Sequence, residues 1–202
     1  EQLKEKIGAS KLFMDEPLAN HTSFKIGGNA SILANVVTES DINCVVKTAL
    51  KENVPYYVIG NGSNILAPDD GIKGIIIKIS EKEPNIKIEE NCVIAPAGIL
   101  LSKLASLIAE HELTGFEFAS GIPGTLGGAI FMNAGAYGGE MKHCVKQVKA
   151  ITKSGKVTTL TNEGCAFDYR SSSIQDEGMI VLEVELKLEK GEKSKILAYT
   201  QE

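Results

Sequence analysis

The chain has 202 residues, which fits one large domain or two small ones. With 43% hydrophobic and 23% charged residues it can bury a core, and its composition is not that of a disordered protein. The net charge of −5 argues against nucleic acid as the main partner, because phosphate binding needs a basic face. A bound anion must therefore be held by local backbone amides and not by a global positive field.

Four cysteines, Cys44, Cys92, Cys144 and Cys165, are spread along the chain without a C-x-x-C pair. This spacing is typical of free thiols in a reducing compartment and not of a zinc site or a disulfide framework. His143 precedes Cys144, but a second spaced pair of ligands is missing, so a buried thiol is favoured over a metal. No signal peptide opens the chain and no apolar run could span a bilayer. We therefore expect a cytoplasmic protein with no membrane partner and no bound metal.

The first half of the chain predicts a small βαβ-like unit. Residues 1–20 are typical of a polar helix that ends in a loop, and 30–37 predict a strand. Thr38, with Asp41 three residues on, predicts the N-cap of a following helix. The strands expected next lie at 56–59 and 74–79, with a long loop over 60–71 between them.

The second half has a different pattern. It predicts a short hairpin, a helix, a second hairpin and a half-exposed closing strand, at 86–95, 100–111, 145–160 and 179–188. Residues 192–202 read as the start of a helix that is cut off in mid-pattern, which predicts a longer parent protein.

Two segments concentrate glycine without a charged side chain. Residues 121–139 (GIPGTLGGAIFMNAGAYGG) hold seven of the 20 glycines, and 58–66 (VIGNGSNIL) follow a predicted strand. Glycine lets backbone approach a neighbour closely, and neutral Ser, Thr and Asn donors add to converging backbone N–H groups. The combination suits a pyrophosphate, although one such loop alone is more often a tight turn.

The common nucleotide motifs are absent. Gly60 and Gly62 begin a G-x-G-x-x-G fingerprint, but Ile65 occupies its third glycine position. Gly155 and Lys156 are followed by Val157 and do not complete a phosphate-binding P-loop. The residues by themselves therefore predict a dinucleotide or flavin binder of another architecture.

Four motifs resemble the UDP-N-acetylenolpyruvoylglucosamine reductase (MurB) family of flavoproteins: NHTSFKIGG at 20–28, GNGSNIL at 60–66, GFEFASGIPGTLGGAIFMNAGAYGGE at 115–140 and DYRSSSI at 168–174. The resemblance covers residues 15 to about 190, in the family's order. It implies an α+β fold of the vanillyl-alcohol-oxidase (PCMH) type with two α+β subdomains, at 1–79 and 80–190. FAD would lie between them, and 191–202 would lead to a C-terminal substrate domain that is absent.

The resemblance also implies non-covalent FAD-binding residues. The first loop would wrap the pyrophosphate with Gly60, Asn61, Gly62, Ser63, Asn64 and Ile65. The second segment would form a facing wall with Ser120, Gly121, Ile122, Gly124, Thr125, Gly127 and Gly128, and it would place Asn133, Ala134 and Gly135 near the flavin.

The implied reaction is a two-step hydride relay. NADPH would reduce FAD, and the hydride would then reduce UDP-N-acetylglucosamine enolpyruvate to UDP-N-acetylmuramate for peptidoglycan synthesis. Arg170 matches the family's catalytic arginine, whose guanidinium would stabilise negative charge on the substrate. Tyr169 and Arg170 would contact the substrate. Without the resemblance, a surface arginine in a turn would be the favoured interpretation of Arg170.

The family carries a third domain that supplies a proton-donor serine and a late glutamate, and the chain stops before either. Ser171, Ser172 and Ser173 do not replace that serine, so we expect FAD binding without efficient turnover. The alternatives are a non-catalytic FAD-fold module and another flavoprotein of the same fold, such as an oxidase. No acidic residue, which would repel pyrophosphate, and no His or Cys for covalent flavin occurs in 60–66 or 120–136.

Two further side chains are given no role. A lone histidine in a polar loop is usually solvated, and this is the expectation for His21. Glu117, between Phe116 and Phe118, could accept a hydrogen bond near the cofactor or could face water.

Overall fold

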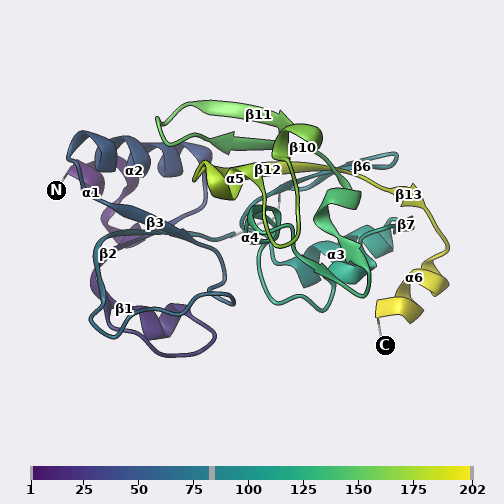
Figure 1. Ribbon diagram of the computed structural model, residues 1–202, viewed down its shortest axis with the longest axis horizontal. Coiled ribbons are helices and arrows are strands. Elements are labelled where there is room, and N and C mark those ends of the chain that lie inside the picture. The colour runs from purple at the N-terminus through teal and green to yellow at the C-terminus, as the bar shows by residue number, and fades with distance from the viewer. Residues whose placement is uncertain (1, 82–84, 201–202) are drawn as a thin grey trace. The chain divides into compact units, whose positions relative to one another are not determined.

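The computed structural model describes residues 2–81 and 85–200. The chain divides into two compact units, Glu1–Lys82 and Glu83–Glu202, and each has its own sheet (Figure 1). The predicted division lay at residue 79, and the second unit includes the tail 191–202 that the prediction separated from it.

Unit 1 is an α+β unit built on four strands. Its elements are α1 (Gln2–Ile7), η1 (Ala9–Lys11), β1 (Leu12–Pro17), η2 (Leu18–His21), β2 (Asn29–Val36), α2 (Glu39–Lys51), β3 (Tyr56–Ile59) and β4 (Ile72–Ile79). The sheet order is β1-β2-β4-β3, with β4 parallel to both β2 and β3. The predicted βαβ unit is therefore confirmed, with α2 as the crossover helix. Thr38 caps α2 as expected, since its Oγ1 accepts a hydrogen bond from the Asp41 backbone N–H at 3.1 Å.

The prediction of a helix ending in a loop over residues 1–20 is wrong in its second half. Among the described residues 2–20 only Gln2–Ile7 is α-helical, and β1 pairs antiparallel with β2 along the edge of the sheet. Phe13 and Met14 are exposed there, so no alternation of polar and apolar residues marks the strand. Pairing with β2 decides the conformation of this segment.

Unit 2 is larger and mainly antiparallel. Its elements are β5 (Lys87–Glu89), β6 (Cys92–Pro96), α3 (Leu101–Glu110), β7 (Leu113–Thr114), η3 (Glu117–Ala119), α4 (Leu126–Phe131), β8 (Gly135–Ala136), β9 (Gly139–Glu140), η4 (Met141–His143), β10 (Val145–Ile151), β11 (Val157–Thr161), η5 (Glu163–Cys165), α5 (Ser173–Asp176), β12 (Ile180–Lys187), β13 (Glu189–Lys190) and α6 (Lys193–Thr200). Both predicted hairpins, the helix α3 and the terminal helix α6 are confirmed.

The last long strand of unit 2, predicted as a half-exposed strand, lies in the centre of its sheet. The order of the five-stranded sheet is β11-β10-β12-β6-β5, so β12 pairs on both sides. Ile180, Val181 and Leu182 are all buried, and the expected half-exposed alternation holds only further along the strand. Figure 1 shows α3 and α4 below this sheet, and α4 packs against β12.

The glycine-rich segment of unit 2 contains a helix that the sequence did not predict. α4 includes Gly127 and Gly128, which are poor helix formers. Tertiary contacts compensate, because Leu126 and Ile130 are fully buried beneath the sheet. The segment 120–128, which was expected to form a wall facing the first loop, is therefore a loop followed by the start of a helix.

Candidate cofactor-binding site

The N-terminal end of α4 is bonded within unit 2. The Leu126 N–H donates to Ile99 O at 2.9 Å, the Gly127 N–H to Ala97 O at 2.8 Å, and the Gly128 N–H to the cap oxygen Thr125 Oγ1 at 3.5 Å. A Cβ added at Gly127 would lie 2.8 Å from the Ala97 Cβ, so this glycine lets the helix approach the end of β6. The amides of Gly127 and Gly128 are thus occupied by protein acceptors.

The loop just before α4 contains backbone N–H groups that have no acceptor among the described residues. Within the part of the chain that the structure describes, the backbone N–H groups of Gly121, Gly124 and Thr125 bond to no protein acceptor. Gly121 is exposed, and a Cβ placed on it would have no atom within 4 Å. Nothing in the packing explains this glycine, whereas a ligand that approaches the backbone would. Of the backbone N–H groups expected to bind a pyrophosphate in 120–128, those of Gly121, Gly124 and Thr125 are therefore the ones that the described residues leave without an acceptor.

In unit 1 the loop at 60–66 lies against the loop at 20–28. Gly62 has φ of +69°, and a Cβ there would overlap the carbonyl oxygen of His21. The Ser23 N–H donates to Gly62 O at 3.0 Å, and the Gly28 N–H donates to Pro68 O at 2.9 Å. The two glycine-containing motifs of this unit thus fit one another, and this contact sets the course of the predicted phosphate loop.

Side chains of the 60–66 loop are divided between core and surface. Ile65 packs against the core cluster that contains Leu33 and Ile76. Asn61 and Asn64 are exposed, and Leu66 is exposed at 73%. Of the predicted binding residues in this loop, Ile65 therefore has a packing role and the two asparagines are accessible.

His21 is not solvated, contrary to the expectation. Its ring is only 16% exposed, with Nε2 2.9 Å from Glu16 Oε1 and Nδ1 3.1 Å from Lys78 Nζ. Burial lowers the pKa of Lys78, and the Glu16 carboxylate partly offsets this. Lys78 can only donate, so Nδ1 accepts and Nε2–H donates to Glu16. The residue whose carbonyl oxygen lies against Gly62 is thus held in place through its side chain as well.

Arg170 and Tyr169 occupy the tip of a tight turn in unit 2. Asp168 and Ser171 exchange backbone hydrogen bonds, from Asp168 N–H to Ser171 O at 3.1 Å and from Ser171 N–H to Asp168 O at 3.2 Å. Arg170 has φ of +55°, which is unusual for a residue with a side chain, and Tyr169 is 86% exposed. Within residues 2–81 and 85–200 the Arg170 guanidinium has no hydrogen-bond or ion-pair partner. Such a free cation at a strained turn is available to an anionic ligand.

The predicted residues 133–135 are mostly internal. Asn133 is 2% exposed and Ala134 is 3% exposed, while Gly135 pairs with Glu140 in the β8–β9 hairpin. The Asn133 side chain donates to Glu140 Oε2 at 2.7 Å and to Asp168 O at 3.0 Å. Its amide is therefore used by the protein and is not open to a cofactor.

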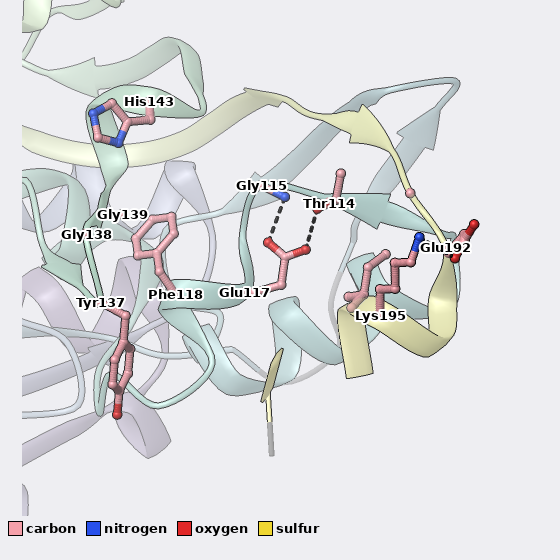
Figure 2. Close-up of a pocket in the computed structure, with 12 residues that line it drawn as sticks. Thr114, Gly115, Glu117, Phe118, Tyr137, Gly138, Gly139, His143, Glu192 and Lys195 are labelled. Atoms are coloured by element: carbon pink, nitrogen blue, oxygen red, sulfur yellow. Dashed lines mark hydrogen bonds and ion pairs between the residues drawn. The ribbon is translucent and has the colours of Figure 1, made fainter. Parts of the chain in front are cut away.

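A separate pocket of about 750 Å³ lies in unit 2 beside η3, the β8–β9 hairpin and α6 (Figure 2). Its lining residues are Thr114, Gly115, Glu117, Phe118, Tyr137, Gly138, Gly139, His143, Gly191, Glu192, Lys195 and Ile196. None of them is a predicted FAD-binding residue, although most lie in or next to the long motif at 115–140. The volume is typical of small-molecule sites.

Glu117 is fully engaged at this pocket. Its carboxylate accepts hydrogen bonds from Thr114 Oγ1 at 2.6 Å and from the Gly115 N–H at 2.7 Å, as the dashed lines in Figure 2 show. Glu192 and Lys195 form an ion pair at 2.9 Å on the side of α6. The Glu117 carboxylate therefore closes the turn into η3, and both of its oxygens accept hydrogen bonds from the protein.

The structure also shows the surroundings of the cysteines and of the potential metal ligands. Cys144 and Cys165 are buried free thiols, and burial raises the pKa of Cys144 to about 12 and that of Cys165 to about 11. The residues that the structure describes contain no cluster of three or more His, Cys, Asp or Glu side chains suited to a metal. They also include no helix that is long and apolar enough to cross a bilayer.

The sequence model of a protein family, the FAD binding domain family, matches residues 30–161 of this chain. The curated UDP-N-acetylenolpyruvoylglucosamine reductase of Alkaliphilus oremlandii is 49% identical over 200 residues, and that of Clostridioides difficile is 48% identical over 178 residues. These matches cover 99% and 88% of this chain but 66% and 59% of the relatives, so the chain spans less than two thirds of their length.

Solved structures show the same likeness. The crystal structure of UDP-N-acetylenolpyruvylglucosamine reductase from Thermus caldophilus aligns with a TM-score of 0.78 and 31% identity, covering 94% of this chain and 66% of that one. An alkyldihydroxyacetonephosphate synthase aligns with a TM-score of 0.66 at 19% identity, over 90% of this chain and 38% of that one, which shows a shared fold alone. The predicted α+β FAD-binding fold and the predicted resemblance are both confirmed.

Proposed function

Because this chain belongs to the FAD binding domain family, we propose that it is the flavin-binding part of a UDP-N-acetylenolpyruvoylglucosamine reductase. The enzyme would use NADPH to reduce UDP-N-acetylglucosamine enolpyruvate to UDP-N-acetylmuramate in peptidoglycan synthesis. The identity of 49% over nearly the whole chain is the observation that carries this proposal. The predicted cytoplasmic location, which follows from the widely spaced free thiols, is part of the proposal.

The residues present fit a non-covalently bound FAD. Gly121, Gly124 and Thr125 have backbone N–H groups without acceptors among the described residues, and neutral amide donors suit a pyrophosphate on an acidic protein. Asn61 adds an accessible side-chain donor in unit 1. No acidic side chain lies in 60–66 or 120–136 to repel the phosphates.

Bound FAD would supply hydride chemistry that side chains lack. The chain's own part would be to hold the cofactor through these amides and to place a fixed positive charge. The exposed Arg170 guanidinium, with Tyr169 beside it, would bind the substrate carboxylate. It would also stabilise the negative charge that grows on the substrate as a hydride adds to its double bond.

The test is FAD binding by the chain and by two matched variants. The wild-type protein should bind FAD, seen as the visible spectrum of the purified protein and as quenching of added flavin. Gly121→Asp places a carboxylate at the open loop, where the fold has room for it, and should weaken FAD binding at least tenfold through repulsion of the pyrophosphate. Gly164→Asp makes the same change at an exposed glycine of η5 and should leave FAD binding unchanged.

Two results would contradict this proposal. A colourless protein that binds no added FAD would exclude the flavin function for this chain. Equal loss of FAD binding in Gly121→Asp and Gly164→Asp would show that net charge and not the loop at 121–125 controls affinity.

A further inference from the structure

The turn that carries Tyr169 and Arg170 is attached on both sides to the C-terminal end of α4. On one side the Asn133 Nδ2 donates to Asp168 O at 3.0 Å, and on the other the Ser172 Oγ donates to Phe131 O at 2.7 Å. Asp168 and Ser172 flank the turn, so neither end of it can move without breaking one of these hydrogen bonds.

Asn133 is itself held from three directions. It adopts φ of +43°, a conformation that asparagine tolerates better than most residues, and its side chain is buried. Besides Asp168 O, its Nδ2 donates to Glu140 Oε2 at 2.7 Å, and its Oδ1 accepts from the Lys142 N–H at 3.0 Å. Hydrogen bonds from Lys142 and from Asn133 lower the pKa of Glu140, so the acceptor stays ionised. Breaking this partly buried network would leave the buried Asn133 amide with unpaired polar atoms.

The Ser172 hydroxyl likewise makes two hydrogen bonds within the protein. Its side chain is completely buried, and its Oγ also accepts a hydrogen bond from the Gln175 N–H at 3.3 Å as the N-cap of α5. One hydroxyl therefore joins the start of α5 to the end of α4. The turn lies between these two anchored points.

The strain at Arg170 agrees with this arrangement. A left-handed conformation is strained for a residue with a Cβ, and such conformations persist only where surrounding contacts impose them. The guanidinium has no partner among the residues that the structure describes, so its place depends on the backbone that carries it.

We propose that Asn133 and Ser172 are positioning residues that hold the Tyr169–Arg170 turn against the end of α4 and thereby fix the place of the Arg170 guanidinium. The proposal rests on the proposed function of Arg170 and adds the residues on which that function depends. Asn133 acts through its amide donor and not through contact with cofactor.

Arg170 is the only arginine in the sequence, which makes the proposal testable without cofactor or substrate. A protease specific for arginine can cut the chain only after Arg170, into fragments 1–170 and 171–202. A sample labelled with ¹⁵N-arginine shows one backbone amide and one side-chain Nε–H signal, so the mobility of this residue is measured directly by the heteronuclear NOE.

Two variants remove one anchor each. Asn133→Asp keeps the shape and the Lys142 contact but turns the donor towards Asp168 O and Glu140 into an acceptor. Ser172→Ala removes the hydroxyl, and Ser173→Ala is its matched control, since Ser173 Oγ donates to Gly164 O at 2.8 Å away from the α4 end. We expect cleavage after Arg170 to accelerate about fivefold or more in the first two variants, with a lower heteronuclear NOE at Arg170, and little change in the control.

The double variant Asn133→Asp/Glu140→Gln separates positioning from general stability. The introduced glutamine amide can donate to the introduced aspartate, so the contact between positions 133 and 140 returns. Asp168 O still lacks the hydrogen bond that Asn133 Nδ2 gives it and keeps only the one from the Ser171 N–H. We expect the unfolding temperature to recover towards wild type while cleavage after Arg170 stays fast. Wild-type cleavage rates in the double variant, or equal rates in Ser172→Ala and Ser173→Ala, would overturn the proposal. Failure of the wild-type protein to bind FAD would instead contradict the proposed function, and it would not affect what the cleavage and NOE measurements show about the turn.

Discussion

Individual glycines of the two motif segments differ in what surrounds their Cα atoms. Gly62 is needed because its left-handed backbone lies against His21 O, and Gly127 because α4 approaches Ala97. A Cβ added at Gly121 would have no atom of the described residues within 4 Å. The sequence predicts only that the backbone approaches something closely; the structure separates glycines that approach protein, such as Gly62 and Gly127, from those with open space beside them, such as Gly121.

His21 shows where residue-level prediction fails. A histidine in a polar loop is usually solvated, but this one is half-buried and bonded to both Glu16 and Lys78. Its partners lie 5 and 57 residues away in the sequence. No local pattern marks such a contact, because β1 and β4 bring the groups together only in the folded sheet.

The buried thiol of Cys144 predicts a pH dependence of stability. Burial raises its pKa to about 12 from an ordinary value of 9.0, so the folded state keeps a proton that the unfolded state releases above pH 9. The free energy of unfolding should therefore be unaffected by this thiol below pH 9. It should fall as the pH rises from 9 towards 12, by up to about 1.4 kcal/mol per pH unit.

Urea unfolding between pH 8 and pH 10.5 measures this effect. Cys144→Ala should lose this part of the slope. Val148→Ala, a truncation at a fully buried site of the neighbouring strand, should lower stability at all pH values but keep the slope. Equal slopes in wild type and Cys144→Ala would contradict the assignment.

At the scale of elements, α4 depends on its close approach to the end of β6. Gly127→Ala would bring its Cβ to 2.8 Å from the Ala97 Cβ and 3.2 Å from Ala97 O. We expect a net loss of stability, because overpacking costs about 1–3 kcal/mol and the gain in helix propensity is only about 1 kcal/mol.

Ala97→Gly/Gly127→Ala is the compensating variant, since it removes the methyl group that the new Cβ meets. A double-mutant cycle by denaturant unfolding should give a favourable coupling of about 1 kcal/mol or more. Additive effects, or a Gly127→Ala variant more stable than wild type, would show that contact with Ala97 does not set the requirement for glycine.

Strands with a clear pattern were predicted from the sequence and the others were not. β3, β4 and the β10–β11 hairpin are apolar or alternating runs bounded by turn residues, and each was found in place. β1 and α4 were missed, because an exposed edge strand and a glycine-containing helix are stabilised by partners distant in sequence.

At the scale of the whole molecule, each unit has its own sheet and buried core. We therefore expect fragments 1–82 and 83–202 to fold when expressed separately, as judged by circular dichroism and dispersed NMR spectra. The proposed FAD-binding residues are divided between the units, so each fragment alone should bind FAD more weakly than the full chain.

The full chain is the reference for both measurements, and an equimolar mixture of the fragments is the control for loss of the covalent link. A fragment that keeps the full affinity for FAD would show that the residues assigned in the other unit do not contribute. A fragment that does not fold would show that its core is not self-sufficient.

The sequence by itself determined the α+β class, the resemblance that leads to FAD, and the candidate residues, because these depend on local pattern and on motifs that survive without coordinates. Only the tertiary structure decided which candidates have free groups. In the fold, the amides of Gly127 and Gly128 and the side chain of Asn133 donate hydrogen bonds to other protein groups. The Gly121 N–H and the Arg170 guanidinium have no such partner among the described residues. The physical reason is that a hydrogen-bonding group can serve a ligand only if no neighbour in the fold already uses it, and those neighbours are assembled by contacts between residues far apart in the chain.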